Sequence, residues 1–252
     1  MTPPTFRDHF SSAALGYAAF RPVYPDALFS DLASRSPARG LAWDCGTGSG
    51  QAARGLAAWF ERVVATDASH AQLGAAEPHA RVRFVRALAE SSPLRSGCVD
   101  LVVVAQALHW FDRASFFAEA RRVLAPRGVV AVWCYGWMEI EPEIDARMRG
   151  FYRDTLGPYW PPERVLVESG YADIEFPFER LAVPRYSIEQ HLTLEQLVGY
   201  VRTWSAVLRY LSATGRDPVA DLVRALEPLW GPSATRAVVW PLAVLAGRVS
   251  GA

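Results

Sequence analysis

Short apolar runs alternate with helix-like segments between residues 41 and 133, and this alternation constrains the fold more than any other feature. The predicted strands are Leu41–Asp44, Arg62–Asp67, Val82–Ala87, Asp100–Ala105 and Val129–Trp133. The predicted helices are Gln51–Trp59, Ser69–Glu77 and Arg113–Leu124. Strands and helices at this spacing build parallel sheets with helices on both faces. The sequence therefore predicts an α/β fold with a doubly wound, mostly parallel sheet.

The residues on either side of this region predict additions to one domain. Residues 1–40 are expected to form an N-terminal helical extension, residues 41–136 the α/β core, and residues 137–252 an aromatic insertion, further helices and the last strands. The extension contains the turn Arg21 to Pro25 (RPVYP), because a residue that precedes proline avoids the helical conformation.

The C-terminal part predicts two further helices and two strands. Thr193 and Gln196 have the spacing of a capping box, which predicts a helix from there to about Leu211. A second helix is expected near Val219–Leu229. The strands are expected within residues 172–181 (IEFPFERL) and at Ala237–Ala246, the latter at an edge of the sheet because it contains a proline.

Composition excludes several classes of function. The chain has 26 basic and 26 acidic residues and a pI of about 7.0, which argues against a nucleic-acid-binding protein. It contains no lysine, so neither a Schiff-base lysine nor a phosphate-loop lysine is available. Three scattered cysteines predict neither a metal site nor disulfides. No secretory signal or membrane-length apolar run is found, so a cytoplasmic protein without membrane association is expected.

The loop after the first predicted strand carries most of the functional information. It reads DCGTGSGQ, with Asp44 followed by Gly46, Gly48 and Gly50. A dinucleotide-binding loop requires a glycine where Gln51 stands. An acid at the strand end would also repel a pyrophosphate, but it would attract a cationic ligand without phosphate.

This loop resembles motif I of the class I S-adenosylmethionine-dependent methyltransferases, and later segments extend the resemblance. Asp67 matches the acid that binds both ribose hydroxyls in that family. The segment from Val85 to Val104 is similar to the family's adenine segment and fourth strand. The resemblance implies a seven-stranded, Rossmann-like sheet and S-adenosylmethionine as cofactor. It implies these cofactor-binding residues: Asp44, Gly46, Thr47, Gly48, Gly50, Asp67, Ala68, Leu88, Ala89, Gln106 and Arg21.

A narrower resemblance reaches outside the core. The residues Tyr17, Arg21 and Tyr24, the QALHWFD run (Gln106 to Asp112) and the GYVRTWSAV segment are together similar to a branch that contains UbiE-like and trans-aconitate methyltransferase-like proteins. The extension is expected to act as a lid over the cofactor, with Arg21 pairing a carboxylate of cofactor or substrate.

His109 and Tyr17 are the candidate catalytic residues. His109 follows the fourth strand, at the sheet edge where ligands of open α/β sheets bind. With its ordinary pKa it could orient a nucleophile or accept the proton of one. A dense aromatic group after the fifth strand predicts an apolar or aromatic substrate pocket: Trp133, Tyr135, Trp137, Tyr159 and Trp160.

The predicted function is methyl transfer from S-adenosylmethionine to a small carboxylate, hydroxyl or amine, without a metal. Two alternatives remain at this point. One is a protein that binds S-adenosylmethionine without catalysing transfer, and the other is an NAD-dependent oxidoreductase. The sequence identifies neither the acceptor nor the oligomeric state.

Overall fold

Eight strands form one sheet in the computed structural model, which describes residues 22–232 and 235–249. The strands are β1 (Leu41–Cys45), β2 (Arg62–Asp67), β3 (Val82–Arg86), β4 (Val99–Ala105), β5 (Leu124–Tyr135), β6 (Glu179–Leu181), β7 (Tyr186–Leu192) and β8 (Arg236–Arg248). Their order is β3-β2-β1-β4-β5-β8-β6, and β7 also pairs with β8. The first five are parallel, while β8 runs antiparallel to β5, β6 and β7. The predicted mostly parallel α/β sheet is confirmed, but it has eight strands in place of seven, because β6 and β7 pair with different stretches of β8.

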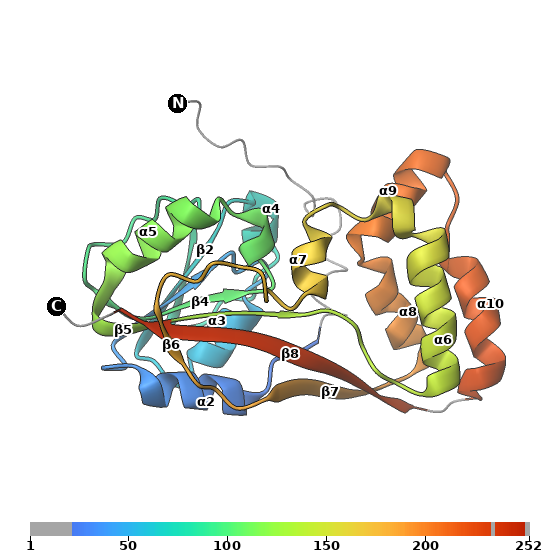
Figure 1. The fold of residues 1–252 in the computed structure, drawn as a ribbon, viewed down its shortest axis with the longest axis horizontal. Helices are drawn as coiled ribbons and strands as arrows, with labels where there is room; N and C mark the ends of the chain where they lie inside the picture. The colour runs from blue at the N-terminus through green and yellow to red at the C-terminus, as the bar shows by residue number, and fades with distance from the viewer. Residues whose placement is uncertain (1–21, 233–234, 250–252) are drawn as a thin grey trace.

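Helices cover both faces of the sheet (Figure 1). They are α2 (Asp26–Arg35), α3 (Gln51–Leu56), α4 (His70–Gly74), α5 (Arg113–Val123), α6 (Pro142–Gly150), α7 (Arg164–Glu168), α8 (Leu194–Arg202), α9 (Ser205–Thr214) and α10 (Val219–Trp230), with the short turns η2 (Leu108–Trp110), η3 (Phe151–Thr155) and η4 (Gly157–Tyr159). Figure 1 shows α2 and α3 on one face and α5 on the other.

Strand β4 shows why the chain takes this doubly covered form. All its residues except the last are buried. Leu101 and Val103 belong to the core on the α2 and α3 face, while Val102 and Val104 belong to the core on the α5 face. Successive side chains of a strand point to opposite faces, so a continuous apolar run requires cover on both.

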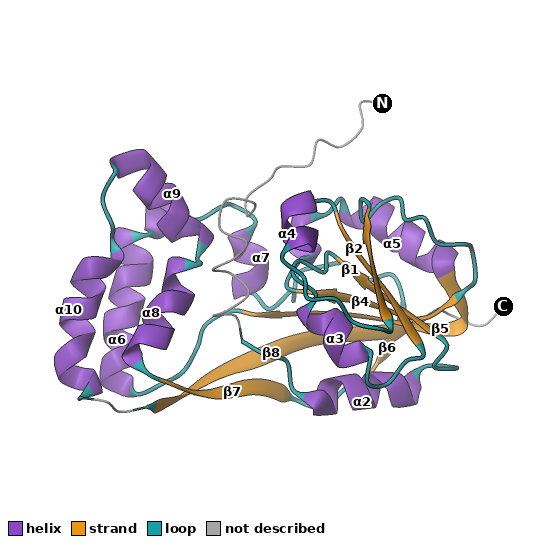
Figure 2. Cartoon of the chain, turned by 180° about the vertical axis from the view of Figure 1, so that it is seen from behind, coloured by secondary structure: helices purple, strands orange, loops and turns teal. Residues whose placement is uncertain are grey.

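The helices α6, α8, α9 and α10 gather beside one end of the sheet and form the helical lobe (Figures 1 and 2). The predicted capping box is present: Gln196 N–H donates to the Thr193 hydroxyl at 3.2 Å, and Thr193 N–H donates to the Gln196 side chain at 2.8 Å. The predicted continuous helix to Leu211 is wrong, because Trp204 leaves the helical conformation and separates α8 from α9.

One prediction about the last strands is also wrong, and another is confirmed only in part. Strand β8 is not at an edge, because β5 lies on one side of it and β6 and β7 on the other. Val239, two residues before Pro241, exchanges hydrogen bonds with Glu139 on the β5 side. The N atom of Pro241 also points to the β5 side. It lies between the contact with Glu139 and the first pair of the β5 ladder, at Tyr135, where the sheet requires no N–H donor.

The segment predicted to contain a strand within residues 172–181 forms one only at its end. Of these residues, only β6 pairs with β8. Phe176 and Phe178 precede it and pack instead against Phe117 of α5, with ring centroids 5.7 and 5.8 Å away. No helix within the described ranges has both the length and the apolar character that a membrane span requires.

Candidate functional site

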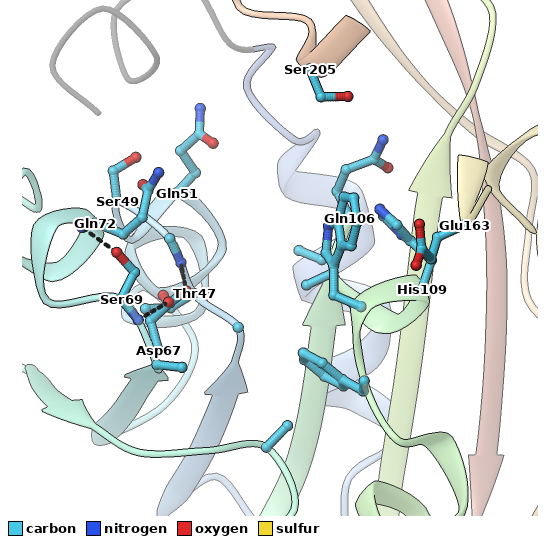
Figure 3. Close-up of a pocket in the computed structure, with 18 of the residues that line it drawn as sticks. Thr47, Ser49, Gln51, Asp67, Ser69, Gln72, Gln106, His109, Glu163 and Ser205 are labelled. Carbon is cyan, nitrogen blue, oxygen red and sulfur yellow. Dashed lines mark hydrogen bonds between the residues drawn. The ribbon is translucent and has the colours of Figure 1, made fainter. Parts of the chain in front are cut away.

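A cavity of about 320 Å³ opens at the carboxyl ends of the parallel strands, between the sheet and the helical lobe. Its walls come from the loops after β1, β2, β3 and β4, from the start of α7 and from the junction of α8 and α9. In Figure 3, Thr47 and Asp67 lie on one side of the cavity, and His109 and Glu163 lie on the other. The carboxyl edge is where open α/β sheets bind their ligands.

The glycine loop requires glycine for two separate reasons. Gly46, Gly48 and Gly50 all have left-handed backbone, with φ of 69°, 56° and 87°. A Cβ atom on Gly46 would lie 2.8 Å from the Cβ of Ala107, and one on Gly50 would lie 2.8 Å from the Phe84 ring. Gly48 has room, with its nearest neighbour at 3.6 Å. The loop therefore presents bare backbone to the cavity at Gly48, held by close packing at the other two glycines.

Asp44 lies beneath this loop and not on the cavity wall. Its carboxylate is fully buried and accepts a hydrogen bond from the Thr47 hydroxyl at 2.5 Å. Burial raises the pKa of Asp44 to about 7, opposed by the bonds from Thr47 and the backbone of Ala53. Its other oxygen, Oδ1, has no partner among the described residues. The acid thus braces the loop from below and retains an unsatisfied acceptor.

Asp67 faces the cavity at the end of β2. Its Oδ2 accepts the Gly48 N–H at 2.9 Å, and its Oδ1 accepts the Ser69 N–H at 2.8 Å. The cap of α4 is Ser69, whose hydroxyl accepts the Gln72 N–H, so Asp67 is not used to cap this helix. A carboxylate offers roughly four acceptor positions, so these two bonds orient the group without precluding a pair of hydroxyls.

Two further loops complete this side of the cavity. Leu88 and Ala89 follow β3 and line the cavity, as the sequence predicts. Gln106 follows β4 with a left-handed φ of 55°. Its side-chain amide donates to the Tyr135 carbonyl at 3.0 Å and accepts the Tyr135 N–H at 2.8 Å. Gln106 lines the cavity, but its amide ties the ends of β4 and β5 together.

His109 is held by a buried tyrosine that sequence analysis did not single out. Its Nδ1 lies 2.9 Å from the Tyr171 hydroxyl, and Tyr171 is fully buried. Burial raises the pKa of the Tyr171 phenol well above its usual range, while backbone N–H groups of His109 and Leu108 act in the opposite direction. The contact between Nδ1 and the hydroxyl admits the phenol as donor to Nδ1, and a neutral imidazole then carries its hydrogen on Nε2.

Aromatic side chains dominate the side of the cavity opposite the glycine loop. Trp160, Tyr200 and Trp204 line it, together with Glu163 and Arg164. The Trp204 ring centroid lies 5.6 Å from that of Trp160 and 5.9 Å from that of Tyr200. We call the following residues the acceptor wall: His109, Trp110, Trp160, Glu163, Arg164, Tyr200 and Trp204.

Most of the predicted site residues meet at this cavity. Those on its wall are Gly46, Thr47, Gly48, Asp67, Ala68, Leu88, Ala89, Gln106 and His109. Asp44 and Gly50 lie behind it, and Tyr17 and Arg21 lie outside the described residues. Of the predicted aromatic group, Tyr135 and Trp160 line the cavity, while Trp133 is core.

Several polar residues of the cavity wall were not predicted from the sequence: Gln51, Ser69, Gln72, Glu90, Glu163 and Arg164. The polar residues on the glycine-loop side directly follow recognised motifs, so their position in the sequence could have predicted that they line the site. Glu163 and Arg164 belong to no motif, and only the folded chain brings them to the cavity.

Comparison with known proteins assigns the family. Residues 43–132 match the family model described as a methyltransferase domain. A protein of Dictyostelium discoideum named as a candidate methyltransferase is 36% identical over 229 residues, which cover 89% of this chain and 87% of that protein. A Saccharomyces cerevisiae protein named as a candidate S-adenosylmethionine-dependent methyltransferase is 26% identical over 247 residues, covering 82% and 84% of the two chains.

A solved structure extends the similarity to the fold. It is named as a candidate type II methyltransferase of Anaeromyxobacter dehalogenans and has 46% sequence identity and a TM-score of 0.86. The match covers 92% of this chain and 100% of that one. With the glycine loop, Asp67 and the cavity between them, these matches show that the chain belongs to the S-adenosylmethionine-dependent methyltransferase family.

Proposed function

We propose that this enzyme transfers the methyl group of S-adenosylmethionine to a small molecule bound against the acceptor wall. The observation that carries the proposal is the single cavity space shared by the glycine loop and the acceptor wall. Its volume of about 320 Å³ is in the range of small-ligand sites. The cavity has aromatic side chains at one end and polar groups at the other, which matches a polar cofactor and a less polar acceptor bound side by side.

The residues of the glycine-loop side fit the cofactor. Asp67 would accept the two ribose hydroxyls, and Leu88 and Ala89 would flank the adenine, with Ala68 beside the ribose. The backbone at Gly46, Thr47 and Gly48 would lie against the methionyl part, because these residues line the cavity and Gly48 presents bare backbone to it. Contributions of Tyr17 and Arg21 remain predictions from the family resemblance.

S-adenosylmethionine supplies a methyl group bound to a sulfonium. When the methyl group is transferred, the sulfur leaves as a neutral thioether. The protein then has to orient the acceptor in line with this group and exclude water. The acceptor wall does both through its large rings. With its hydrogen on Nε2, His109 would donate to an acceptor oxygen and not remove a proton. We therefore propose the first of the two roles expected for His109, that of an orienting group, and not that of a proton acceptor.

The narrower family assignment is part of this proposal. The UbiE-like and trans-aconitate methyltransferase-like branch is supported by the QALHWFD run, whose His109 and Trp110 line the cavity. Tyr24, from the N-terminal pattern, lines it as well.

The test is a transfer screen with tritiated S-adenosylmethionine and the full chain. The acceptors are small carboxylic acids, phenols and amines, offered beside a denatured protein mixture and a nucleic-acid sample. We expect label in small molecules of one chemical class. Label that enters only protein or nucleic acid would contradict a small-molecule acceptor.

A further inference from the structure

The acceptor wall contains a cation held in a fixed position by aromatic side chains. The Nε of Arg164 donates to the Tyr152 hydroxyl at 2.8 Å. Its guanidinium carbon lies 4.8 Å from the Trp160 ring centroid and 5.5 Å from that of Tyr152. Both contacts are within the range of cation–π interactions. Arg164 is therefore fixed at three points before any ligand binds.

The two rings are themselves fixed. Their centroids lie 4.5 Å apart, and the Trp160 indole N–H donates to the Tyr152 carbonyl at 3.2 Å. The Tyr152 hydroxyl in turn donates to Glu168. An arginine with this support loses little side-chain entropy when it binds a ligand, which is the condition for a strong and selective contact.

The terminal amino groups of Arg164 have no hydrogen-bond acceptor within the ranges that the structure describes. Among those residues, the bond from Nε to Tyr152 is the one hydrogen bond of this side chain. None of the ion pairs among those residues includes Arg164. Arg164 is one of the residues that line the cavity. A planar guanidinium with unused donors matches a planar oxyanion, which it can bind through two parallel hydrogen bonds.

The neighbouring carboxylate restricts the charge of that ligand. Glu163 lines the same wall and points into the cavity near His109 (Figure 3). It forms no ion pair within the described part of the chain. Among the described residues that line the cavity, Arg164 is the one arginine, whereas Asp67, Glu90, Asp112 and Glu163 are acids. A single negative charge can therefore be placed on Arg164, and a second one would be repelled by these carboxylates. The large rings of Trp160 and Trp204 favour a flat, apolar body.

We propose that Arg164, seated on Tyr152 and Trp160, forms the acceptor subsite and selects a planar aromatic molecule with one oxyanion, a carboxylate or a phenolate. This rests on the proposed function and specifies its substrate class. An oxyanion acceptor supplies the electron pair of the new oxygen–carbon bond, and the pair of the broken sulfur–carbon bond stays on sulfur. No proton has to leave, which agrees with His109 acting as a donor.

The experiment is calorimetry on the full chain saturated with S-adenosylhomocysteine. The probes are benzoate, cinnamate and 4-nitrophenolate as single oxyanions, benzamide and cinnamamide as neutral matches, and isophthalate as a dianion. We expect at least one oxyanion to bind, and to bind about tenfold or more tightly than its neutral match and than isophthalate. Comparison of the carboxylates with 4-nitrophenolate distinguishes the two sources of oxyanion.

Arg164→Gln should weaken that oxyanion about tenfold or more and leave the affinity for S-adenosylhomocysteine unchanged. Arg149→Gln is the matched control, because Arg149 lies over the Trp137 ring at 4.8 Å but is not on the cavity wall. It should change neither affinity. The proposal is overturned if no oxyanion binds, if none binds more tightly than its neutral match, or if Arg164→Gln leaves the oxyanion affinity unchanged or also weakens S-adenosylhomocysteine. Failure of the unaltered chain to bind S-adenosylhomocysteine would instead contradict the proposed function.

Discussion

The two sides of the cavity are built in different ways. The glycine-loop side uses backbone and a few short side chains, all from loops at the ends of adjacent parallel strands. The acceptor wall uses large side chains from η2, from the start of α7 and from the junction of α8 and α9. The first side depends on backbone conformation, while the second depends on how the helical lobe packs against the sheet. The first is expected to tolerate substitution poorly, and the second to change specificity more readily.

The largest effect is expected at Gly46. Gly46→Ala introduces a left-handed non-glycine residue, at a cost of about 1–2 kcal/mol. It also forces a Cβ atom against Ala107, for a further cost of about 1–3 kcal/mol. Gly97→Ala is the control, because Gly97 has a φ of 66° and nothing within 4 Å. Urea unfolding should show a clearly greater loss for Gly46→Ala. Equal losses would show that the loop does not depend on close packing.

Asp44 makes the support of the loop sensitive to pH. Its folded pKa of about 7 lies above the ordinary value of 3.8, so the folded protein binds the proton more tightly than the unfolded chain. The stability that protonation of Asp44 contributes to the folded protein is fully present below the unfolded pKa and is lost as the pH rises toward 7. Asp44→Asn should gain stability over the unaltered chain between pH 4 and pH 7, by a few kcal/mol at most.

Urea unfolding of both proteins at a series of pH values measures this difference. A stability difference that does not depend on pH would contradict the raised pKa of Asp44.

Tyr171 offers the corresponding test on the acceptor wall. Tyr171→Phe keeps the ring but leaves Nδ1 of the buried His109 without its partner, at a cost of about 1–2 kcal/mol. Tyr210→Phe is the control, since the Tyr210 ring packs against Tyr159 and its hydroxyl has no hydrogen bond within the described residues. The control should be nearly neutral in urea unfolding. S-adenosylhomocysteine affinity should be unchanged in both, and a loss in Tyr171→Phe would place His109 on the cofactor side.

The smallest effect is expected at the start of α8, which carries Tyr200 to the acceptor wall. Thr193→Ala removes one half of the capping box and should cost about 1 kcal/mol of folding stability. Gln196→Ala should cost less stability in the Thr193→Ala background than in the unaltered chain, because the two side chains act as a pair. Full additivity in chemical unfolding would show that the two halves of the box act independently.

The difference between the two sides also explains what sequence could predict. The glycine loop and Asp67 were predictable because a backbone conformation and a strand end constrain residue types at fixed spacing. The role of Arg164 was not predictable from the sequence, because its partner Tyr152 lies in the π-helical turn η3 and only packing brings the two residues together. The fold shows the same contrast. The strands of the parallel core follow from apolar runs, whereas the break at Trp204 follows from burial of its indole among Tyr152, Trp160 and Tyr200.

The most direct test of the account is titration of S-adenosylhomocysteine into the unaltered chain, Asp67→Asn and Asp112→Asn. Asp112 is a matched acid on the cavity wall, where it caps α5, and asparagine caps helices equally well. The account predicts binding by the unaltered chain and by Asp112→Asn. It predicts a loss of about tenfold or more in Asp67→Asn, since one acceptor for the ribose hydroxyls is removed. Equal affinity in all three would contradict the role of Asp67 and place the nucleoside elsewhere.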